Sequence, residues 1–206
     1  MKYLAILAAT ILLLSPTAFA AGPLGFGLQA TGANVNFEGP TKEMYGFGFG
    51  GGLHLDVNFI PMLSLRLQGD YVLFSPDKGK YAAYLARGAG RSPSDLSVEG
   101  GRLTFISAIA NVKFDVLPAP LVSPYVTGGV GITSFSYSDL TVNYRGQVIP
   151  LNISKPESQT KFSANLGAGI DVNVAVVNVY LEARYSWIFT KGSTSTYIPV
   201  SLGVTL

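Results

Sequence analysis

The sequence predicts an all-β protein, an eight-stranded antiparallel up-and-down transmembrane β-barrel with short periplasmic turns and longer extracellular loops. Three observations predict this fold: an export segment at the N-terminus, period-two alternation of apolar and polar residues through the rest of the chain, and connections that alternate between short and long. The composition agrees, because only 13% of the 206 residues are charged and 48% are apolar, whereas soluble chains carry about 25% charged residues.

The first twenty residues have the pattern of a secretory signal. Lys2 provides a positive charge, an apolar run follows over residues 4–14, and an A-x-A cleavage site ends at Ala20. The run is shorter than the roughly 20 residues that a spanning helix needs. We therefore expect a cleaved Sec signal peptide over residues 1–20 and one barrel domain over residues 21–206. The chain contains no cysteine, which excludes disulfides and thiolate metal sites.

Alternation is clearest over residues 161–174, where the two faces of an extended strand separate completely. The apolar face holds Phe162, Ala164, Leu166, Ala168, Ile170, Val172 and Val174, and the other face holds Lys161, Ser163, Asn165, Gly167, Gly169, Asp171 and Asn173. The remaining strands are expected near residues 24–37, 44–59, 63–73, 102–116, 124–138, 179–189 and 198–206. In 124–138 the pattern does not fix the faces near the loop end. Each strand is near or above the roughly 9 to 11 residues that cross a bilayer when tilted.

The connections separate into two groups by length. Short turns are expected near residues 60–62, 117–123 and 175–178. Longer segments are expected at 38–44, 76–101, 139–158 and 190–195. Short turns at one end and long loops at the other are typical of an outer-membrane barrel, with the short end in the periplasm.

A soluble lipocalin-type barrel would also alternate, with its apolar face inward. Its exterior would be rich in Lys and Glu, whereas the polar faces here are mostly Gly, Ser, Asn and Thr with single charges. A narrow eight-stranded interior accommodates small residues and a few paired charges better than a set of Phe and Leu. The membrane barrel is therefore favoured.

Pro199 conflicts locally with a regular last strand, because proline has no N–H to donate to the ladder. A bulge or an early strand end is therefore expected there.

These features resemble a known family, the small OmpA/OmpX-like outer-membrane β-barrel proteins. The resemblance rests on the signal segment, the eight two-faced strands, "PYVTGGVGI" at 124–132 and the closing "YIPVSLGVTL". It implies location in the bacterial outer membrane and contact with the barrel-assembly machinery during insertion. The residues that match the family's C-terminal assembly signal are Ile198, Val200, Leu202, Val204 and Leu206. The family usually ends in an aromatic residue, and Leu206 departs from that pattern.

Charged residues on the predicted inner faces are few and of both signs. They are Asp56, Arg66, Asp70, Lys113, Asp115, Asp171, Glu182 and Arg184. Because an unpaired buried charge is costly, we expect a network of paired charges that fills the lumen. The alternative is a charged constriction in a narrow solute channel, which is porin-like.

The stretch "MYGFGFGGGLHLDVNF" at 44–59 also carries a weak enzyme signal. Its glycines fit the G-x-G-x-x-G spacing of a dinucleotide-binding turn, but no helix follows to bind a pyrophosphate, so no cofactor is expected. His54 is the only histidine, and it lies in the expected periplasmic half of its strand, away from extracellular substrates. A lipid A-modifying enzyme is therefore the less favoured alternative, and we expect no catalytic residue. The residues expected to face the lumen are Gly46, Gly48, Gly50, Gly52, His54, Asp56 and Asn58.

The loops are the remaining candidate for function. Residues 76–101 contain "YAAYLAR", which could form a short helix, and basic residues at Lys78, Lys80, Arg87 and Arg91. The favoured interpretation is a solvated loop of mixed charge, which is common at protein surfaces. The alternative is that these basic residues contact lipopolysaccharide phosphates or an unknown host or surface ligand. A formal charge of +2 and the absence of a basic stripe give no indication of nucleic-acid binding. The expected role is a non-catalytic barrel in envelope integrity or surface contact.

Overall fold

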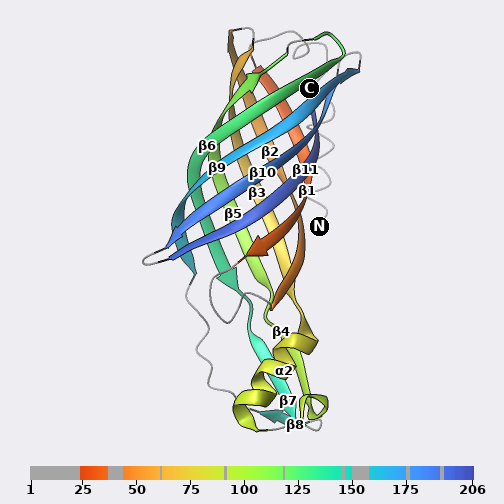
Figure 1. The fold of residues 1–206 in the computed structure, drawn as a ribbon, viewed down its shortest axis with the longest axis vertical. Helices are drawn as coiled ribbons and strands as arrows, with labels where there is room; N and C mark the ends of the chain where they lie inside the picture. Colours follow the sequence, from red (N-terminus) through yellow and green to blue (C-terminus); the bar gives the residue numbers. More distant parts are fainter. Residues whose placement is uncertain are drawn as a thin grey trace, which may run out of the picture.

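Eight long strands close into an antiparallel barrel, which confirms the predicted fold class (Figure 1). The computed structural model describes residues 24–36, 44–60, 62–90, 92–117, 119–144, 147–149, 158–174, 177–190 and 193–206. The expected signal peptide lies outside the described residues. The barrel strands are β1 (Leu24–Asn36), β2 (Tyr45–Ile60), β3 (Leu63–Pro76), β5 (Leu103–Asp115), β6 (Val122–Tyr137), β9 (Gln159–Val174), β10 (Val177–Thr190) and β11 (Ser193–Thr205).

The barrel closes where β1 pairs with β11. Every barrel strand pairs with antiparallel neighbours, in the order β1-β11-β10-β9-β6-β5-β3-β2. The last rung joins Phe26 and Leu206, each of which donates its N–H to the other's carbonyl at 3.1 and 2.9 Å. Closure leaves no strand edge toward lipid, as a membrane-spanning sheet requires.

Pro199 is accommodated without the expected bulge or early end. Between Ala183–Val200 and Ser186–Tyr197 the pairing of β10 with β11 is interrupted, but the register on both sides is the same, and β11 continues to Thr205. On its other side Pro199 pairs with Ala33 of β1. The proline therefore interrupts one ladder locally without shifting it.

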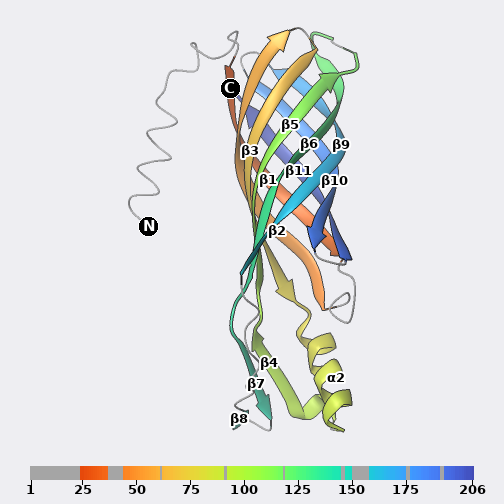
Figure 2. The same cartoon turned by 90° about the vertical axis from the view of Figure 1, so that its left-hand side faces the viewer.

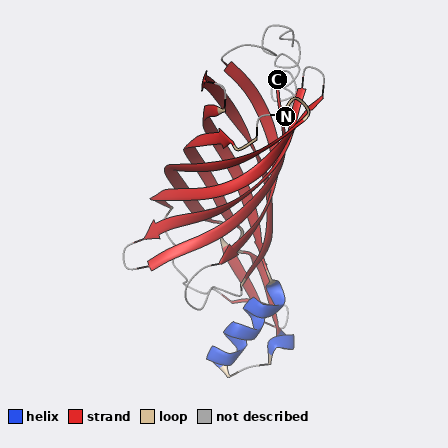
Figure 3. Cartoon of the chain, turned by 45° about the horizontal axis from the view of Figure 1, so that its top comes forward, coloured by secondary structure: helices blue, strands red, loops and turns tan. Residues whose placement is uncertain are grey.

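A small α/β unit continues the barrel at the end opposite the C terminus (Figures 1 and 3). It comprises α2 (Lys78–Ala89), the 3₁₀ turn η2 (Pro93–Asp95), and a sheet of β4 (Leu96–Gly100), β7 (Leu140–Tyr144) and β8 (Gln147–Ile149), and is named here the extension. The short helix expected from "YAAYLAR" is confirmed. The sheet was not predicted, because residues 139–158 were expected to form only a long loop.

The extension is built on the hairpin of β5 and β6. Leu103 of β5 lies opposite Tyr137 of β6, and Gly100 lies opposite Leu140 in the same register, so β4 and β7 prolong these two barrel strands. Gly100 and Gly101 have φ of 80° and 69°, which bends the chain between β4 and β5 at a cost that only glycine avoids. Asp77 is the N-cap of α2, and its side chain accepts a hydrogen bond from the N–H of Lys80 at 3.1 Å. Gly90, with φ 60°, is the C-cap.

The outward faces of the barrel strands carry a continuous apolar band. Their exposed large residues include Leu28, Phe49, Leu53, Leu67, Ile106, Val112, Val126, Val130, Phe162, Leu166, Leu181 and Leu202. Trp187 contacts Tyr185 with ring centroids 4.9 Å apart, and Phe162 stacks on Phe189 at 5.8 Å, near the end of the band that faces the extension. Apolar residues outside with aromatic residues at the band's edge are typical of a transmembrane barrel.

The polarity of the wall inverts toward the extension. There the inward positions become apolar, as in Val72, Phe74, Leu103 and Phe105, which are at most 3% exposed. Many outward positions there are polar, namely Asn34, Asn36, Ser75, Arg102, Thr104, Ser134, Ser136, Thr194 and Thr196. Exposed apolar residues remain beside some of them, since Asn34 lies between Phe47 and Ile198, and Thr194 lies opposite Phe189. This part of the barrel therefore has an apolar interior and a largely polar exterior, and it adjoins the lipid-facing band on the side of the extension.

One predicted face is wrong. A register shift between Tyr45 and Gly48 takes Gly46 out of the alternation, so that Tyr45 is buried and Gly46 is exposed. From Gly48 onward His54 and Asp56 are buried and Phe49, Leu53 and Phe59 are exposed, as the alternation predicts.

Candidate functional site: the lumen and the extension

Arg66 on β3 is the centre of the lumen network. Its guanidinium is 1% exposed and binds both carboxylate oxygens of Asp56 on β2, at 2.7 and 2.8 Å. It also lies 3.6 Å from Glu182 on β10 and 4.6 Å from the centre of the Tyr180 ring. Bidentate geometry and a second carboxylate compensate for the loss of water around this cation.

A second cation connects the other side of the lumen. Arg184 on β10 lies 3.1 Å from Glu182 and 3.4 Å from Asp70 on β3. Asp70 also accepts hydrogen bonds from the amides of Gln68 and Gln29. The two arginines are therefore linked through Glu182, and the network crosses the barrel from β2 to β10.

Lys113 forms a third group nearer the short turns. Its ammonium donates to Asp171 on β9, lies 3.7 Å from Asp115, and lies 4.4 Å from the centre of the Tyr125 ring. Tyr125 in turn donates to Glu182 at 2.9 Å. The structure thus brings all eight predicted lumen charges into ion pairs.

His54 lies beside this network. It is 2% exposed, its Nε2 is 2.9 Å from the hydroxyl of Thr205, and its Nδ1 is 3.3 Å from the hydroxyl of Tyr180. Asp56 lies 3.9 Å from Nε2. These groups include a hydroxyl, an imidazole and a carboxylate; His54 and Asp56 are buried, whereas Thr205, at the end of β11, is half-buried.

Tyr125 and Tyr180 belong to the network, although the sequence did not single them out. Each ring fits over a glycine directly opposite in the neighbouring strand, Gly169 for Tyr125 and Gly203 for Tyr180. A Cβ at either glycine would lie 2.5 Å from ring atoms. Close approach of the ring is thus possible only because the opposite residue has no side chain. The inward parity of Tyr180, opposite to Leu181, is a signal that could have found it.

Between the charge network and the extension, an apolar cluster closes the lumen. Phe74 and Phe105 pack edge to face with centroids 5.0 Å apart, and Phe105 contacts Tyr197 at 5.5 Å. We name this cluster the plug. Its buried members are Ala33, Val35, Met44, Tyr45, Val72, Phe74, Leu103, Phe105, Ile188 and Tyr197. The lumen therefore has a charged half toward the short turns and an apolar half toward the extension.

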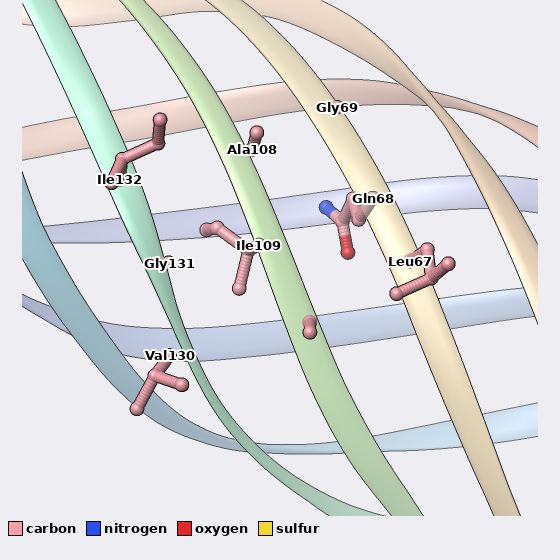
Figure 4. Close-up of a pocket in the computed structure, with 9 residues that line it drawn as sticks. Leu67, Gln68, Gly69, Ala108, Ile109, Val130, Gly131 and Ile132 are labelled. Carbon is pink, nitrogen blue, oxygen red and sulfur yellow. The ribbon is translucent and has the colours of Figure 1, made fainter.

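A depression of about 550 Å³ lies on the wall formed by β3, β5 and β6 (Figure 4). Gly69 and Ala108 leave it without large side chains, and Leu67, Val130 and Ile132 border it. Gln68, which also lines it, is 4% exposed and donates to Asp70. Its outer border is apolar and faces the lipid band, so the depression offers a surface for acyl chains and no polar site.

Tyr81 joins the extension to the barrel. It packs against the plug and also against the extension's own core, which is formed by Ala82, Val98 and Val142. Two further contacts fix the junction: the N–H of Asp77 donates to the carbonyl of Met44 at 2.7 Å, and the hydroxyl of Tyr45 donates to the carbonyl of Gly101 at 3.1 Å. The extension is thus packed against the barrel mouth through side chains and backbone.

The predicted loop cations lie on α2. Lys78, Lys80 and Arg87 are exposed, whereas Arg91 lies outside the described residues. Within the described ranges, the ion pairs of the structure do not include these three cations. Four of the predicted assembly residues lie on β11, and Leu206 directly follows it. The exposed fractions of Ile198, Val200, Leu202 and Leu206 are 37 to 57%.

Replacing Tyr81 with alanine is expected to loosen the extension while leaving the barrel intact. The substitution removes the ring shared by the plug and the extension core, whereas Tyr84→Ala removes an exposed ring, 51% exposed, from the same helix. Limited proteolysis should cut Tyr81→Ala several-fold faster between residues 77 and 101, because local opening becomes easier. Tyr84→Ala should behave as the parent protein, and both should keep heat-modifiable migration. Equal cleavage of the two variants would contradict the prediction.

A family model and several solved structures are similar to this chain. A family model described as "Outer membrane protein beta-barrel domain" matches residues 5–205, and no curated protein matches the chain. Among solved structures, Neisserial surface protein A (NspA) is similar at a TM-score of 0.59 and 14% identity, covering 90% of this chain and 97% of that one. The N-terminal barrel of OprF from Pseudomonas aeruginosa (0.47, 13%, 88% and 97%) and Ail of Yersinia pestis (0.44, 17%, 88% and 95%) are also similar.

The described residues contain no group of three or more His, Cys, Asp or Glu residues placed to hold a metal ion. Within the same part of the chain no helix has the length and apolar character needed to cross a membrane.

Proposed function

Because this chain belongs to the outer membrane protein β-barrel domain family, we propose that it is a non-catalytic outer-membrane protein that makes surface contact through the extension. In this role the barrel is an anchor in the outer membrane. The extension, which follows the long-loop end of the barrel, faces the medium.

One observation carries the proposal: the long loops form a folded unit and not a set of separate turns. The extension has its own apolar core around Val98 and Val142, and Tyr81 connects that core to the plug. Ordering a loop costs about 1–2 kcal/mol per residue in backbone entropy. A contact surface that is already folded avoids this cost when it binds, which favours a role in recognition.

The test compares cells that lack the gene and carry either the parent chain or a chain without the extension. In the shortened chain, residues 77–101 and 139–157 are each replaced by a short Gly-Ser turn. Two properties are measured: attachment of the cells to an epithelial monolayer, and uptake of a hydrophobic dye, which reports envelope integrity. We expect the shortened chain to restore the dye barrier but not attachment.

Heat-modifiable migration of the shortened chain is the control, because it shows that the barrel still folds. Restoration of attachment by the shortened chain would overturn the proposed role. If neither chain changes attachment and both restore the dye barrier, the contribution is to envelope integrity alone, and the surface-contact proposal is wrong.

The filled lumen supports the absence of a channel function. The charged half of the lumen is bridged by Arg66, Glu182 and Arg184. In the apolar half, the rings of Phe74 and Phe105 are in contact. We therefore expect no discrete conductance from the parent protein in planar bilayers. Replacing both Phe74 and Phe105 with glycine opens the apolar half only, so this variant should also stay closed. Stable conductance steps from the parent protein would favour the porin-like alternative.

His54 is also the residue on which a lipid A-modifying activity would depend. We expect His54→Ala to leave the acylation pattern of lipid A unchanged, because the imidazole is buried beside Thr205 and Tyr180. Mass spectrometry of lipid A from cells that carry either chain provides the measurement. A change in acylation that depends on His54 would contradict the non-catalytic role.

A further inference from the structure

An exposed apolar rim lies at the end of the barrel opposite the extension. Figure 2 shows this end at the top of the view and the extension at the bottom. The rim is formed by residues that are 56 to 63% exposed, and it is named here the collar. Its members are Phe59 and Ile60 at the end of β2, Leu117 and Leu121 between β5 and β6, and Val174 at the end of β9. An apolar surface of this kind marks a contact with another protein or with a membrane.

The three parts of the collar lie side by side along the rim. The N–H of Asp115 donates to the carbonyl of Met62 at 2.9 Å, so the turn after β2 lies against the end of β5. The N–H of Asn173 donates to the carbonyl of Leu121 at 2.9 Å, so the turn after β5 lies against the end of β9. The strand order of the barrel, in which β2 and β3 adjoin β5 and β6 and these adjoin β9, gives the same arrangement. The collar is therefore one surface.

The segments that carry the collar contain no charged residue. Residues 57–65, 116–126 and 172–181 lack Asp, Glu, Lys and Arg altogether. The flanking charges belong to the lumen network: Asp115, which directly precedes the second range, lies 3.7 Å from Lys113. A protein interface has a polar rim and about one hydrogen bond per 100–200 Å², and turns in water are polar. The composition of the collar therefore suits lipid better than either.

The backbone of the turn between β5 and β6 is bonded within the protein. The hydroxyl of Ser123 donates to the carbonyl of Ala119 at 2.9 Å and accepts from the N–H of the same residue at 3.2 Å. Asn173 binds the next two carbonyls: its side-chain amide donates to Pro120 at 3.3 Å, and its backbone N–H donates to Leu121 at 2.9 Å. Hydrocarbon has no partner for backbone polar groups, so a segment in lipid must satisfy them internally. These three carbonyls have partners that do not depend on water.

The collar lies beyond the stretch of wall that hydrocarbon ordinarily covers. On β6 the outward apolar residues run from Ile132, next to the polarity inversion, to Val122. That stretch measures about 34 Å along the strand, or about 24 Å across the bilayer at a tilt of about 45°. It matches the usual apolar band of about 25 Å. Leu121 and Leu117 are exposed beyond Val122, so the collar extends the apolar surface past the expected end of the hydrocarbon.

We propose that the collar binds phospholipids of the periplasmic leaflet, whose acyl chains cover Phe59, Leu117 and Leu121 and thicken the bilayer locally around the turns. An apolar surface longer than the hydrocarbon is accommodated by such thickening. The collar is continuous with the lipid-facing band, which has the same chemistry. The turns then end at the lipid headgroups and not in the aqueous periplasm. The inference does not rest on the surface-contact role, because the collar and the extension lie at opposite ends of the barrel.

Tryptophan fluorescence of the full chain in phospholipid vesicles tests the location of the collar. Trp187, the single tryptophan, is first replaced by phenylalanine. In this background Phe59→Trp labels the collar, and Asn58→Trp labels the neighbouring position, which faces the mouth of the lumen. In vesicles with brominated acyl chains, which quench tryptophans that touch lipid, Phe59→Trp should lose as much fluorescence as Val130→Trp in the lipid-facing band. Asn58→Trp should lose much less. Leu121→Trp should behave as Phe59→Trp does, and heat-modifiable migration shows that each variant folds.

Bilayer thickness provides a second test, with a collar variant that combines Phe59→Ser, Leu117→Ser and Leu121→Ser. The parent should gain stability as the acyl chains of the vesicles lengthen, whereas the collar variant should not, because lipid then covers serine. In the longest-chain vesicles the unfolding equilibrium constant of the variant should be at least about tenfold larger than that of the parent. In the shortest-chain vesicles, where water surrounds the turns of both chains, the constants should agree within about twofold. Urea unfolding followed by Trp187 fluorescence provides both values.

Photocrosslinking in cells separates lipid from protein as the occupant. A benzophenone amino acid in place of Leu121 in the full chain should form adducts with phospholipid, which mass spectrometry identifies. An adduct with a periplasmic protein or with a second copy of the chain would overturn the proposal. Quenching of Phe59→Trp by aqueous iodide and not by brominated lipid would overturn it too, as would the same dependence on acyl-chain length for the parent and the collar variant. None of these results concerns attachment, so the surface-contact role is tested separately.

Discussion

Replacing Arg66 with methionine is expected to lower the free energy of unfolding by about 3–5 kcal/mol, because removing one partner of a buried ion pair leaves the other charge uncompensated. Arg66 binds both oxygens of Asp56 and lies 3.6 Å from Glu182, and it is 1% exposed. Glu182 keeps Arg184 at 3.1 Å, so Asp56 is the carboxylate that loses its main partner. Equilibrium urea unfolding, followed by the fluorescence of Trp187, the single tryptophan, measures the change.

Two variants control this prediction. Arg102→Met removes an exposed arginine from the outward side of the barrel and should cost within about 0.5 kcal/mol. The double variant Asp56→Asn with Arg66→Met removes both charges of the pair and should be more stable than Arg66→Met alone, since no isolated charge remains beside the arginine site. A double variant no more stable than Arg66→Met would show that the cost comes from lost packing and not from an unpaired carboxylate.

Lysine at Val130 is expected to cost about 2–4 kcal/mol, whereas lysine at Ser136 is expected to cost about 0–1 kcal/mol. Both residues are on the outward face of β6, and Val130 is 52% exposed in the lipid-facing band. Ser136 lies beyond the polarity inversion, opposite Thr104. The added residue, the strand and the face are the same, so only the position relative to the hydrocarbon differs. Urea unfolding in phospholipid vesicles measures both costs, and similar costs at the two positions would contradict the assigned boundary.

The barrel could be predicted from the sequence because two different environments face every strand. Lipid and lumen select opposite side chains, so alternation persists over whole strands, as in residues 161–174. The pair of Asp56 and Arg66 follows from the same reasoning, since a short turn near residues 60–62 places these two residues opposite each other. The contact of Arg184 with Asp70 does not follow, because it crosses the lumen between strands that are not neighbours.

The faces of residues 124–138 could not be fixed for a physical reason. Ser134 and Ser136 point outward and Phe135 and Tyr137 point inward, which is the reverse of the arrangement at Val126 and Val130. The alternation itself is unbroken. What changes is the medium outside the wall, from lipid to water. The alternation alone does not show at which residue the lipid-facing part of the strand ends.

The extension was missed for a different reason. Its strands β4 and β7 are five residues each, and their apolar positions form patterns too short to separate from a loop. Their pairing also joins residues that are 40 to 48 positions apart in the sequence. Only the helix, with its apolar residues at helical spacing near Tyr81 and Leu85, gave a local signal.

The inversion of polarity fixes the vertical position of the whole molecule. Sinking toward the periplasm would bury Asn36, Thr104 and Ser136 in hydrocarbon, and rising would expose Val130 and Ile132 to water. Both displacements cost free energy, so the barrel has one preferred depth in the bilayer. The distance of the extension from the lipid headgroups is therefore set by the barrel wall, and any ligand of the extension must reach that height above the cell surface.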